Sequence, residues 1–446
     1  MRFIDTIKNI WKIEDLRKRI SITLLLIIIY RFGTYVVLPG VDPGALTALQ
    51  AQTRGGLLAL LDMFSGGGFS NASVFALGIM PYISASIVMQ LMTIIVPSFQ
   101  KLQREGESGR KKINQWTRYL TVIILIFQGT AYLTNLNVQM RMAGSALPSG
   151  YWFNISSTMI MAGGSMFVLW LGERITDRGI GNGISFIIMV GIMARLPHAF
   201  FQEFISRMSE KTGGLVMFLF ENLALLFVIA GAIALVQGTR RVPVQYAKRI
   251  VGNKQYGGAR QYIPLKVNAA NVMPIIFAQA IMMVPISIAG FASSGNTGSV
   301  MMAFMNNTGF WYNFVFALLI IAFTYFYTAI TINPTQMADD LKRNNGFIPG
   351  IKPGKATKNY LDEIMSRITL PGAFFLALVA IMPAFASLAG VSQEFSQFYG
   401  GTSLLILVGV VLDTLQQIES HLLMRHYDGL LKSGRIKGRS GTAGSY

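Results

Sequence analysis

The sequence predicts an all-α polytopic membrane protein with ten transmembrane helices. Its 446 residues are 52% hydrophobic and only 13% charged, and the mean hydropathy is +0.48. This composition is more apolar and less charged than that of soluble domains. Ten apolar segments approach or reach the roughly 17–25 residues that cross a bilayer. Of the 38 Lys and Arg residues, 32 fall in six short segments between the apolar stretches. The positive-inside rule produces this alternation in a chain that crosses a membrane many times.

The ten predicted spans follow one another along the whole chain. They cover residues 20–38, 74–96, 119–136, 155–172, 183–200, 215–236, 270–292, 312–332, 368–390 and 403–423. Because ten is even, both termini lie on one face, and their basic residues predict that this face is cytoplasmic. No small-residue cleavage site follows the N-terminal stretch MRFIDTIKNIWKIEDLRKRI. We therefore expect the first apolar run to be retained as a span.

The spans and loops divide the chain into seven regions. We expect an amphipathic N-terminus, the first six spans, a basic cytoplasmic loop, two spans, a second cytoplasmic loop, two spans and a cytoplasmic tail. These regions are residues 1–19, 20–236, 237–268, 270–332, 333–367, 368–423 and 424–446. Five plus five spans also permit two five-helix halves of inverted orientation, because five is odd.

One segment does not fit the alternation of spans and polar loops. Residues 39–73 lie on the external side, yet they contain the apolar run LLALLDMF, from Leu57 to Phe64. Eight helical residues rise only about 12 Å, whereas the hydrocarbon core is about 30 Å thick. Such a helix either packs flat on the outer face or re-enters to close a cavity, and the sequence leaves both open.

Catalytic and metal-binding signatures are missing from the sequence. The chain has no cysteine and three histidines, and it lacks zinc-protease, serine-hydrolase and phosphate-loop motifs. We therefore expect no catalytic residue, no metal and no cofactor. A ten-span secondary transporter remains the alternative, although Asp413 is the only acidic residue clearly inside a span, and ion-coupled transporters rely on such groups. An intramembrane protease would need a nucleophile or metal motif.

Several segments, in order along the chain, resemble the bacterial SecY family. They are FSGGGFSNASVFALGIMPYISASIVMQL (64–91), EGESGRKKI (105–113), WLGERITDRGIGNGIS (170–185), YAKRIVG (246–252), PLKVNAANVMP (264–274), FIPGIKPG (347–354) and YGGTSLLI (399–406). The resemblance implies a central hourglass pore between the two halves, which passes unfolded preproteins across the bacterial inner membrane. It also implies that transmembrane segments leave sideways into lipid.

The resemblance further implies an apolar ring at the waist of the pore. Matched motif by motif, the ring falls on Ile83, Ile87, Ile184, Ile188, Ile276 and Ile406. Branched apolar side chains would hold back ions without binding a passing chain, as in pores that gate by dewetting. Because Ile184 and Ile406 lie near span starts, we expect those helices to begin recessed in the membrane.

Two more elements of the channel follow from the resemblance. The external apolar segment becomes a plug at 57–71, seated under the ring. Its named residues are Leu57, Leu58, Leu60, Leu61, Met63, Phe64, Ser65, Gly66, Gly67, Gly68 and Asn71. A lateral gate lies between the second and third spans and the seventh and eighth. We expect buried amides of Gln128 and Gln279 there, either as a latch or as ordinary interhelical hydrogen bonds.

The partners that the resemblance implies are the small membrane subunits SecE and SecG, the motor ATPase SecA, the translating ribosome, preproteins with their signal sequences, and lipids. The two long cytoplasmic loops carry 13 basic residues between them, more than orientation requires. We expect docking on Arg240, Arg241, Lys248, Arg249 and Lys352. The family usually has Arg at the position of Lys352, so the bidentate fork of a guanidinium is missing there.

Overall fold

The computed structural model is mostly helical, with a three-stranded and a two-stranded sheet in the part of the chain that it describes. It describes residues 13–42, 44, 62–142, 148, 150–209, 214–246, 249–251, 254–256, 260–279, 281–282 and 309–432. In the first half the helices are α2 (Glu14–Gly33), α5 (Met80–Ile95), α6 (Pro97–Arg104), α7 (Glu107–Met142), α8 (Tyr151–Arg178) and α9 (Gly183–Ser209).

The second half contains the remaining helices and the strands. The helices are α10 (Gly214–Gln237), α13 (Phe310–Thr331), α14 (Pro334–Arg343), α15 (Lys355–Leu388), α16 (Gln393–Ser396), the 3-10 turn η2 (Gln397–Tyr399) and α17 (Gly401–Lys432). The strands are β1 (Thr239–Tyr246), β2 (Arg249–Val251), β3 (Lys254–Tyr256), β4 (Arg260–Lys266) and β5 (Gly346–Phe347).

Each predicted span contains helix among the residues that the structure describes. Seven described helices are long and apolar enough to cross a membrane, or up to eight if the bent α5–α6 pair is one span. The first span corresponds to α2, and residues 273–279 are helical at the start of the seventh. Helices α7, α15 and α17 extend beyond the predicted spans, because a helix can continue into charged sequence after the apolar stretch ends.

The predicted second span, 74–96, differs from the structure at its start. Helix α5 begins only at Met80, after a series of turns in which Gly78 has a φ of +53°. Pro81 then occupies the first turn of the helix, where proline needs no hydrogen-bond partner. At the other end the chain bends by 102° between α5 and α6, at Pro97.

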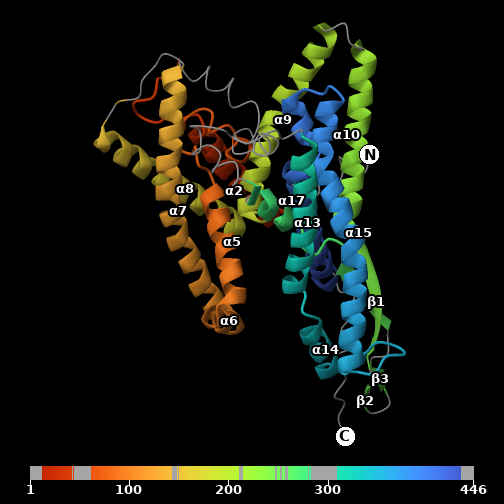
Figure 1. The fold of residues 1–446 in the computed structure, drawn as a ribbon. Coiled ribbons are helices and arrows are strands. Elements are labelled where there is room, and N and C mark those ends of the chain that lie inside the picture. The colour runs from red at the N-terminus through yellow and green to blue at the C-terminus, as the bar shows by residue number, and fades with distance from the viewer. Residues whose placement is uncertain are drawn as a thin grey trace.

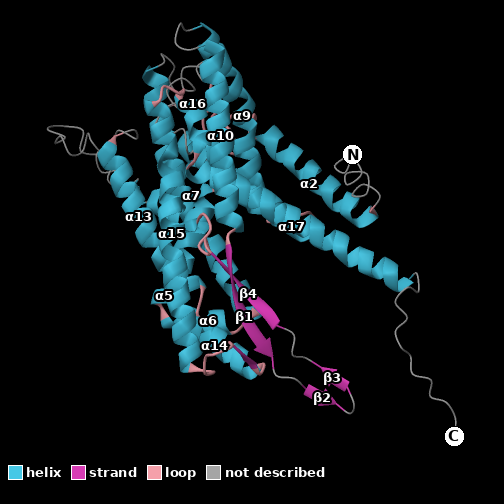
Figure 2. Cartoon of the chain, turned by 90° about the vertical axis from the view of Figure 1, so that its right-hand side faces the viewer, coloured by secondary structure: helices cyan, strands magenta, loops and turns pink. Residues whose placement is uncertain are grey.

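The two long loops predicted to be cytoplasmic contain strands, which the prediction of an all-α protein did not include. β1 pairs antiparallel with β4, with Val242 opposite Ile263, and also with β5 from the second loop. Side chains of this hairpin, of α14 and of the start of α15 share one apolar cluster that includes Val244, Leu341 and Leu361. Figure 2 shows the hairpin projecting from the helices, with β2 and β3 at its tip. The two predicted loops are therefore one folded unit.

The helices form two groups that meet along one side. In the first group α7 packs on α5 and α8, and α8 packs on α2 and α9. In the second group α15 packs on α13, α10 and α17. The groups meet where α9 contacts α10 and α17, and they are visible as separate bundles in Figure 1. This arrangement places the starts of α9 and α17 side by side in the centre.

Candidate functional site

The ring isoleucines come from four segments that are far apart in the sequence. Ile83, Ile184, Ile188 and Ile406 lie in one apolar cluster, to which α5, α9 and α17 all contribute. Ile188 and Ile406 are only 6% and 7% exposed. Ile87 is buried and Ile276 is half-buried, but among the described residues neither belongs to this cluster.

The starts of α9 and α17 pack closely against neighbouring helices, and their depth in the membrane stays a prediction. A Cβ at Gly183, the first residue of α9, would lie 1.9 Å from the backbone oxygen of Gly172 in α8. A Cβ at Gly400, just before α17, would lie 2.1 Å from the backbone oxygen of Val379 in α15. Only glycine permits backbones to approach this closely. These two contacts hold the first turns of α9 and α17 against α8 and α15.

The described end of the predicted plug segment shares an apolar cluster with residues of the predicted ring. Met63 and Phe64, 2% and 6% exposed, belong to the same apolar cluster as Ile188 and Ile406. A helical turn at 62–64 then ends in consecutive tight turns. The predicted plug residues Leu57, Leu58, Leu60 and Leu61 lie outside the described residues.

Glycines shape the turn that follows Phe64 and Ser65. Gly66 and Gly67 have φ values of +65° and +90°, a region that side chains with a Cβ seldom adopt. A Cβ at Gly66 would also lie 3.1 Å from the Cα of Gly191 on α9. The backbone oxygen of Gly68 accepts a hydrogen bond of 3.0 Å from the amide of Ser73. The plug segment therefore turns back towards α5 while touching α9.

Polar groups from α2 and α7 bind the backbone of this turn. The Tyr30 hydroxyl donates to the Ser65 carbonyl at 3.0 Å, and the Arg31 guanidinium donates to the Gly66 carbonyl at 2.7 Å. The Tyr132 hydroxyl donates to the Phe69 carbonyl at 2.8 Å. The amide of the predicted plug residue Asn71 also donates to the Thr34 carbonyl, at 3.4 Å.

A charge pair that the sequence analysis did not single out joins the plug segment to α9. The side chain of Asp62 is fully buried and forms an ion pair with the guanidinium of Arg195. Its other carboxylate oxygen accepts a hydrogen bond of 2.8 Å from the amide of Ser70. The available signal was an aspartate inside an otherwise apolar run. Arg195 lines a cavity of about 290 Å³, whose walls also include His198 and Glu394.

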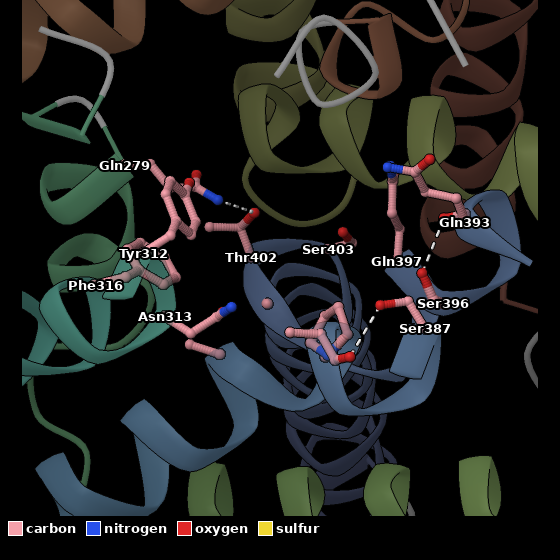
Figure 3. A pocket seen from close by; sticks show the side chains of 15 residues that line it. Gln279, Tyr312, Asn313, Phe316, Ser387, Gln393, Ser396, Gln397, Thr402 and Ser403 are labelled. Atoms are coloured by element: carbon pink, nitrogen blue, oxygen red, sulfur yellow. Dashed lines mark hydrogen bonds between the residues drawn. The ribbon is translucent and has the colours of Figure 1, made fainter. Parts of the chain in front are cut away.

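The two predicted gate amides do not meet each other in the described hydrogen-bond network. Gln279 donates to the Thr402 hydroxyl at 3.4 Å, within the second half of the chain. Figure 3 shows this pair at the edge of a pocket of about 110 Å³, with Tyr312 and Phe316 beside it. Gln128 on α7 is half-buried, as is Gln279, so both are more accessible than the buried amides we expected.

A different pair crosses between the two groups of helices. The Tyr327 hydroxyl of α13 lies 3.4 Å from the side-chain oxygen of Gln90 on α5. Next to it, a groove of about 980 Å³ runs between α5, α6 and α7 on one side and α13 and α14 on the other. Sequence reasoning missed this pair because only the packing of α5 opposite α13 identifies it.

Three of the five predicted docking residues lie on the folded unit that the two predicted loops form. Arg240 and Arg241 are exposed on β1, and Lys352 is exposed between β5 and α15. Lys248 lies outside the described residues, and Arg249 begins β2. The apolar cluster shared by the hairpin, α14 and α15 joins both loops into one folded unit.

Comparisons with known proteins agree on one family. The SecY family model matches residues 73–415. The protein translocase subunit SecY of Thermotoga maritima is 40% identical over 439 residues, which cover 97% of this chain and 99% of that protein. SecY of Escherichia coli K12 is 39% identical over 428 residues, covering 95% and 96%.

A solved structure titled as a protein conducting channel has the same fold. It superposes with a TM-score of 0.63 at 16% identity, covering 91% of this chain and 92% of that chain. At this identity the likeness concerns the fold alone. The sequence relatives, in contrast, are similar over nearly their whole length.

Proposed function

Because this chain belongs to the SecY family, we infer that it is the channel subunit of a protein translocase, embedded in a bacterial membrane. It conducts unfolded preproteins between its two groups of helices. The chain supplies the path, and the work of transport comes from partners.

We assign the waist of the channel to the six isoleucines of the ring. The observation that carries this assignment is that four of them, from three different helices, share one buried cluster with Met63 and Phe64. An apolar constriction excludes ions because a narrow apolar passage dewets. It also offers no hydrogen bond to a polypeptide in transit, so the chain can slide.

The plug at 57–71 completes the seal on the external side. Its support comes from the apolar contact of Met63 with the ring cluster and from polar contacts to α2, α7 and α9. Opening then consists of moving the plug away while the ring surrounds the passing chain. The lateral exit opens between α5 and α13, where the Tyr327–Gln90 contact crosses.

The exposed basic residues of the cytoplasmic unit form the docking surface for SecA and the ribosome. Support comes from the joining of both loops through one apolar core, which presents Arg240, Arg241 and Lys352 on a single body. SecE and SecG bind the lipid-facing surface, and both termini lie in the cytoplasm with this unit.

The experiment that tests the seal is ion conductance in planar bilayers. The purified complex is compared with a variant lacking residues 57–71. We expect the deletion to preserve the fold and preprotein transport and to raise the resting conductance. Unchanged conductance in a well-folded deletion variant would contradict the plug assignment.

A further inference from the structure

A second buried charge cluster lies at the external end of α9 and α10. Arg207 on α9 donates from Nε to the Glu203 carboxylate at 3.0 Å and from Nη2 to the Glu221 carboxylate of α10 at 2.6 Å. The three side chains are 8%, 1% and 3% exposed. Charged groups are seldom buried so completely unless they are paired, and nothing in the transport path described above uses them.

The cluster binds a backbone carbonyl and a backbone amide in the turn between α15 and α16. Arg207 also donates to the backbone carbonyl of Gly390. The second carboxylate oxygen of Glu203 accepts a hydrogen bond of 3.0 Å from the amide of Ser392. One backbone acceptor and one backbone donor, two residues apart, are therefore held by a single ion pair on α9.

The next residues along the chain are held by α10. The Tyr399 hydroxyl in η2 donates to the backbone carbonyl of Glu221 at 2.8 Å. Burial raises the pKa of this hydroxyl well above its usual value, so it remains protonated and available as a donor. The segment from Gly390 to Tyr399 is thus fixed at both ends to the α9–α10 pair, which stands at the top of Figure 1.

This fixed segment forms part of the apolar seat of the plug. Val391, Phe395 and Tyr399, 6%, 1% and 3% exposed, belong to the same cluster as Met63 and Phe64. The Phe395 and Tyr399 rings also meet edge to face, with their centroids 5.6 Å apart. A shift of the 390–399 segment would therefore loosen the packing around the plug without touching the plug itself.

We propose that Arg207, Glu203 and Glu221 are positioning residues that hold the 390–399 segment as one wall of the plug seat. The three residues set how firmly the channel is sealed at rest, although none of them bonds to a described residue of the plug. Because the cluster links α9 of the first half to the turn after α15 of the second, it makes the seal depend on the relative position of the two halves. The proposal rests on the proposed plug function.

Removal of the guanidinium is the most informative change. Arg207→Gln leaves two buried carboxylates without their cation, which costs far more than the loss of an exposed pair. We expect the resting conductance of the reconstituted complex to rise by about fivefold or more, the scale of coupling between linked sites. Arg141→Gln is the matched control, because Arg141 is an exposed arginine near the end of α7 whose side chain, among the described residues, donates to Asn137 of the same helix.

The same substitution in the variant lacking residues 57–71 separates the two proposals. If the cluster acts through the plug seat, Arg207→Gln adds nothing to the conductance of the plug-deleted channel. An equal increase with and without the plug would overturn the inference, and so would a well-folded Arg207→Gln complex with unchanged conductance. If deletion of the plug itself leaves conductance unchanged, the plug function is refuted, and the positioning role that rests on it is overturned as well.

A milder variant covers the case in which Arg207→Gln does not fold. Tyr399→Phe removes only the hydroxyl that ties η2 to α10 and keeps the ring in its apolar contacts. We expect a smaller rise in resting conductance that again requires the plug. A Tyr399→Phe complex with the conductance of the unaltered channel would then overturn the inference.

Discussion

We predict that the ion pair between Asp62 and Arg195 stabilises the closed state of the channel relative to the open state. Arg195→Gln leaves the fully buried Asp62 carboxylate with the Ser70 amide as its remaining hydrogen-bond donor in the described contacts. An acceptor stranded in this way costs about 1–3 kcal/mol. We take the lower half of that range, because the Arg195 side chain is 33% exposed and water replaces part of the contact. The closed state should lose stability by about 1–2 kcal/mol relative to the open state.

That loss predicts a measurable change in gating. Since about 1.4 kcal/mol is a factor of ten in an equilibrium constant, the open probability at rest should rise by about 5- to 30-fold. Single-channel recording in planar bilayers measures it directly. The double variant Asp62→Asn with Arg195→Gln removes the stranded charge, so it should recover most of the closed state.

Two results would refute the reasoning. One is an Arg195→Gln channel that opens no more often than the unaltered channel, although deletion of 57–71 does raise its conductance. The other is a double variant that leaks as much as the single one, because the cost would then not come from the unpaired carboxylate.

Three further predictions concern other parts of the molecule. Gly400→Ala should lower the melting temperature of the complex in detergent, since its Cβ would lie 2.1 Å from the Val379 oxygen, whereas Gly409→Ala should not, since no described atom outside its own helix lies within 4 Å of its Cβ. Equal melting temperatures would argue against a recessed, tightly packed start of α17. Tyr327→Phe removes the hydroxyl that contacts Gln90 of α5, and the lateral exit should then accept signal sequences of lower hydrophobicity. Transport of a series of signal sequences of graded hydrophobicity measures this, and an unchanged hydrophobicity threshold would exclude a latch. Lys352→Arg restores a bidentate fork and should increase ribosome or SecA affinity in a binding titration, whereas unchanged affinity for both would show that the fork is irrelevant here.

The span positions could be predicted because composition alone decides them. A run of about 20 apolar residues has few alternatives to a membrane helix, and charged flanks mark where it leaves the membrane. Helices α5 and α15 begin at Met80 and Lys355, whereas the predicted spans begin at residues 74 and 368. Hydropathy marks where a chain is apolar, not where its backbone hydrogen bonds begin.

The candidate site was harder to predict because its residues are ordinary in the sequence. Isoleucines four apart on a helix are typical of any core, so Ile83 and Ile188 were identified only through the family resemblance. Asp62–Arg195 and Arg207–Glu221 join residues of different helices. Their pairing depends on how α9 packs, which no local pattern specifies. The folded cytoplasmic unit was missed for the same reason, since β1 pairs with strands from two separate loops.

The central claim is that a polypeptide passes through the isoleucine ring. The direct test is cysteine crosslinking to a stalled secretory chain. Because the sequence contains no cysteine, an introduced cysteine is the only thiol that can react. Single cysteines at Ile83 and Ile276 test the ring, and a cysteine at Val88, 42% exposed on the same helix as Ile83, is the control. We predict crosslinks at both ring positions and none, or far fewer, at Val88. Absence of crosslinks at Ile83 and Ile276, or equal yield at Val88, would contradict the channel path described here.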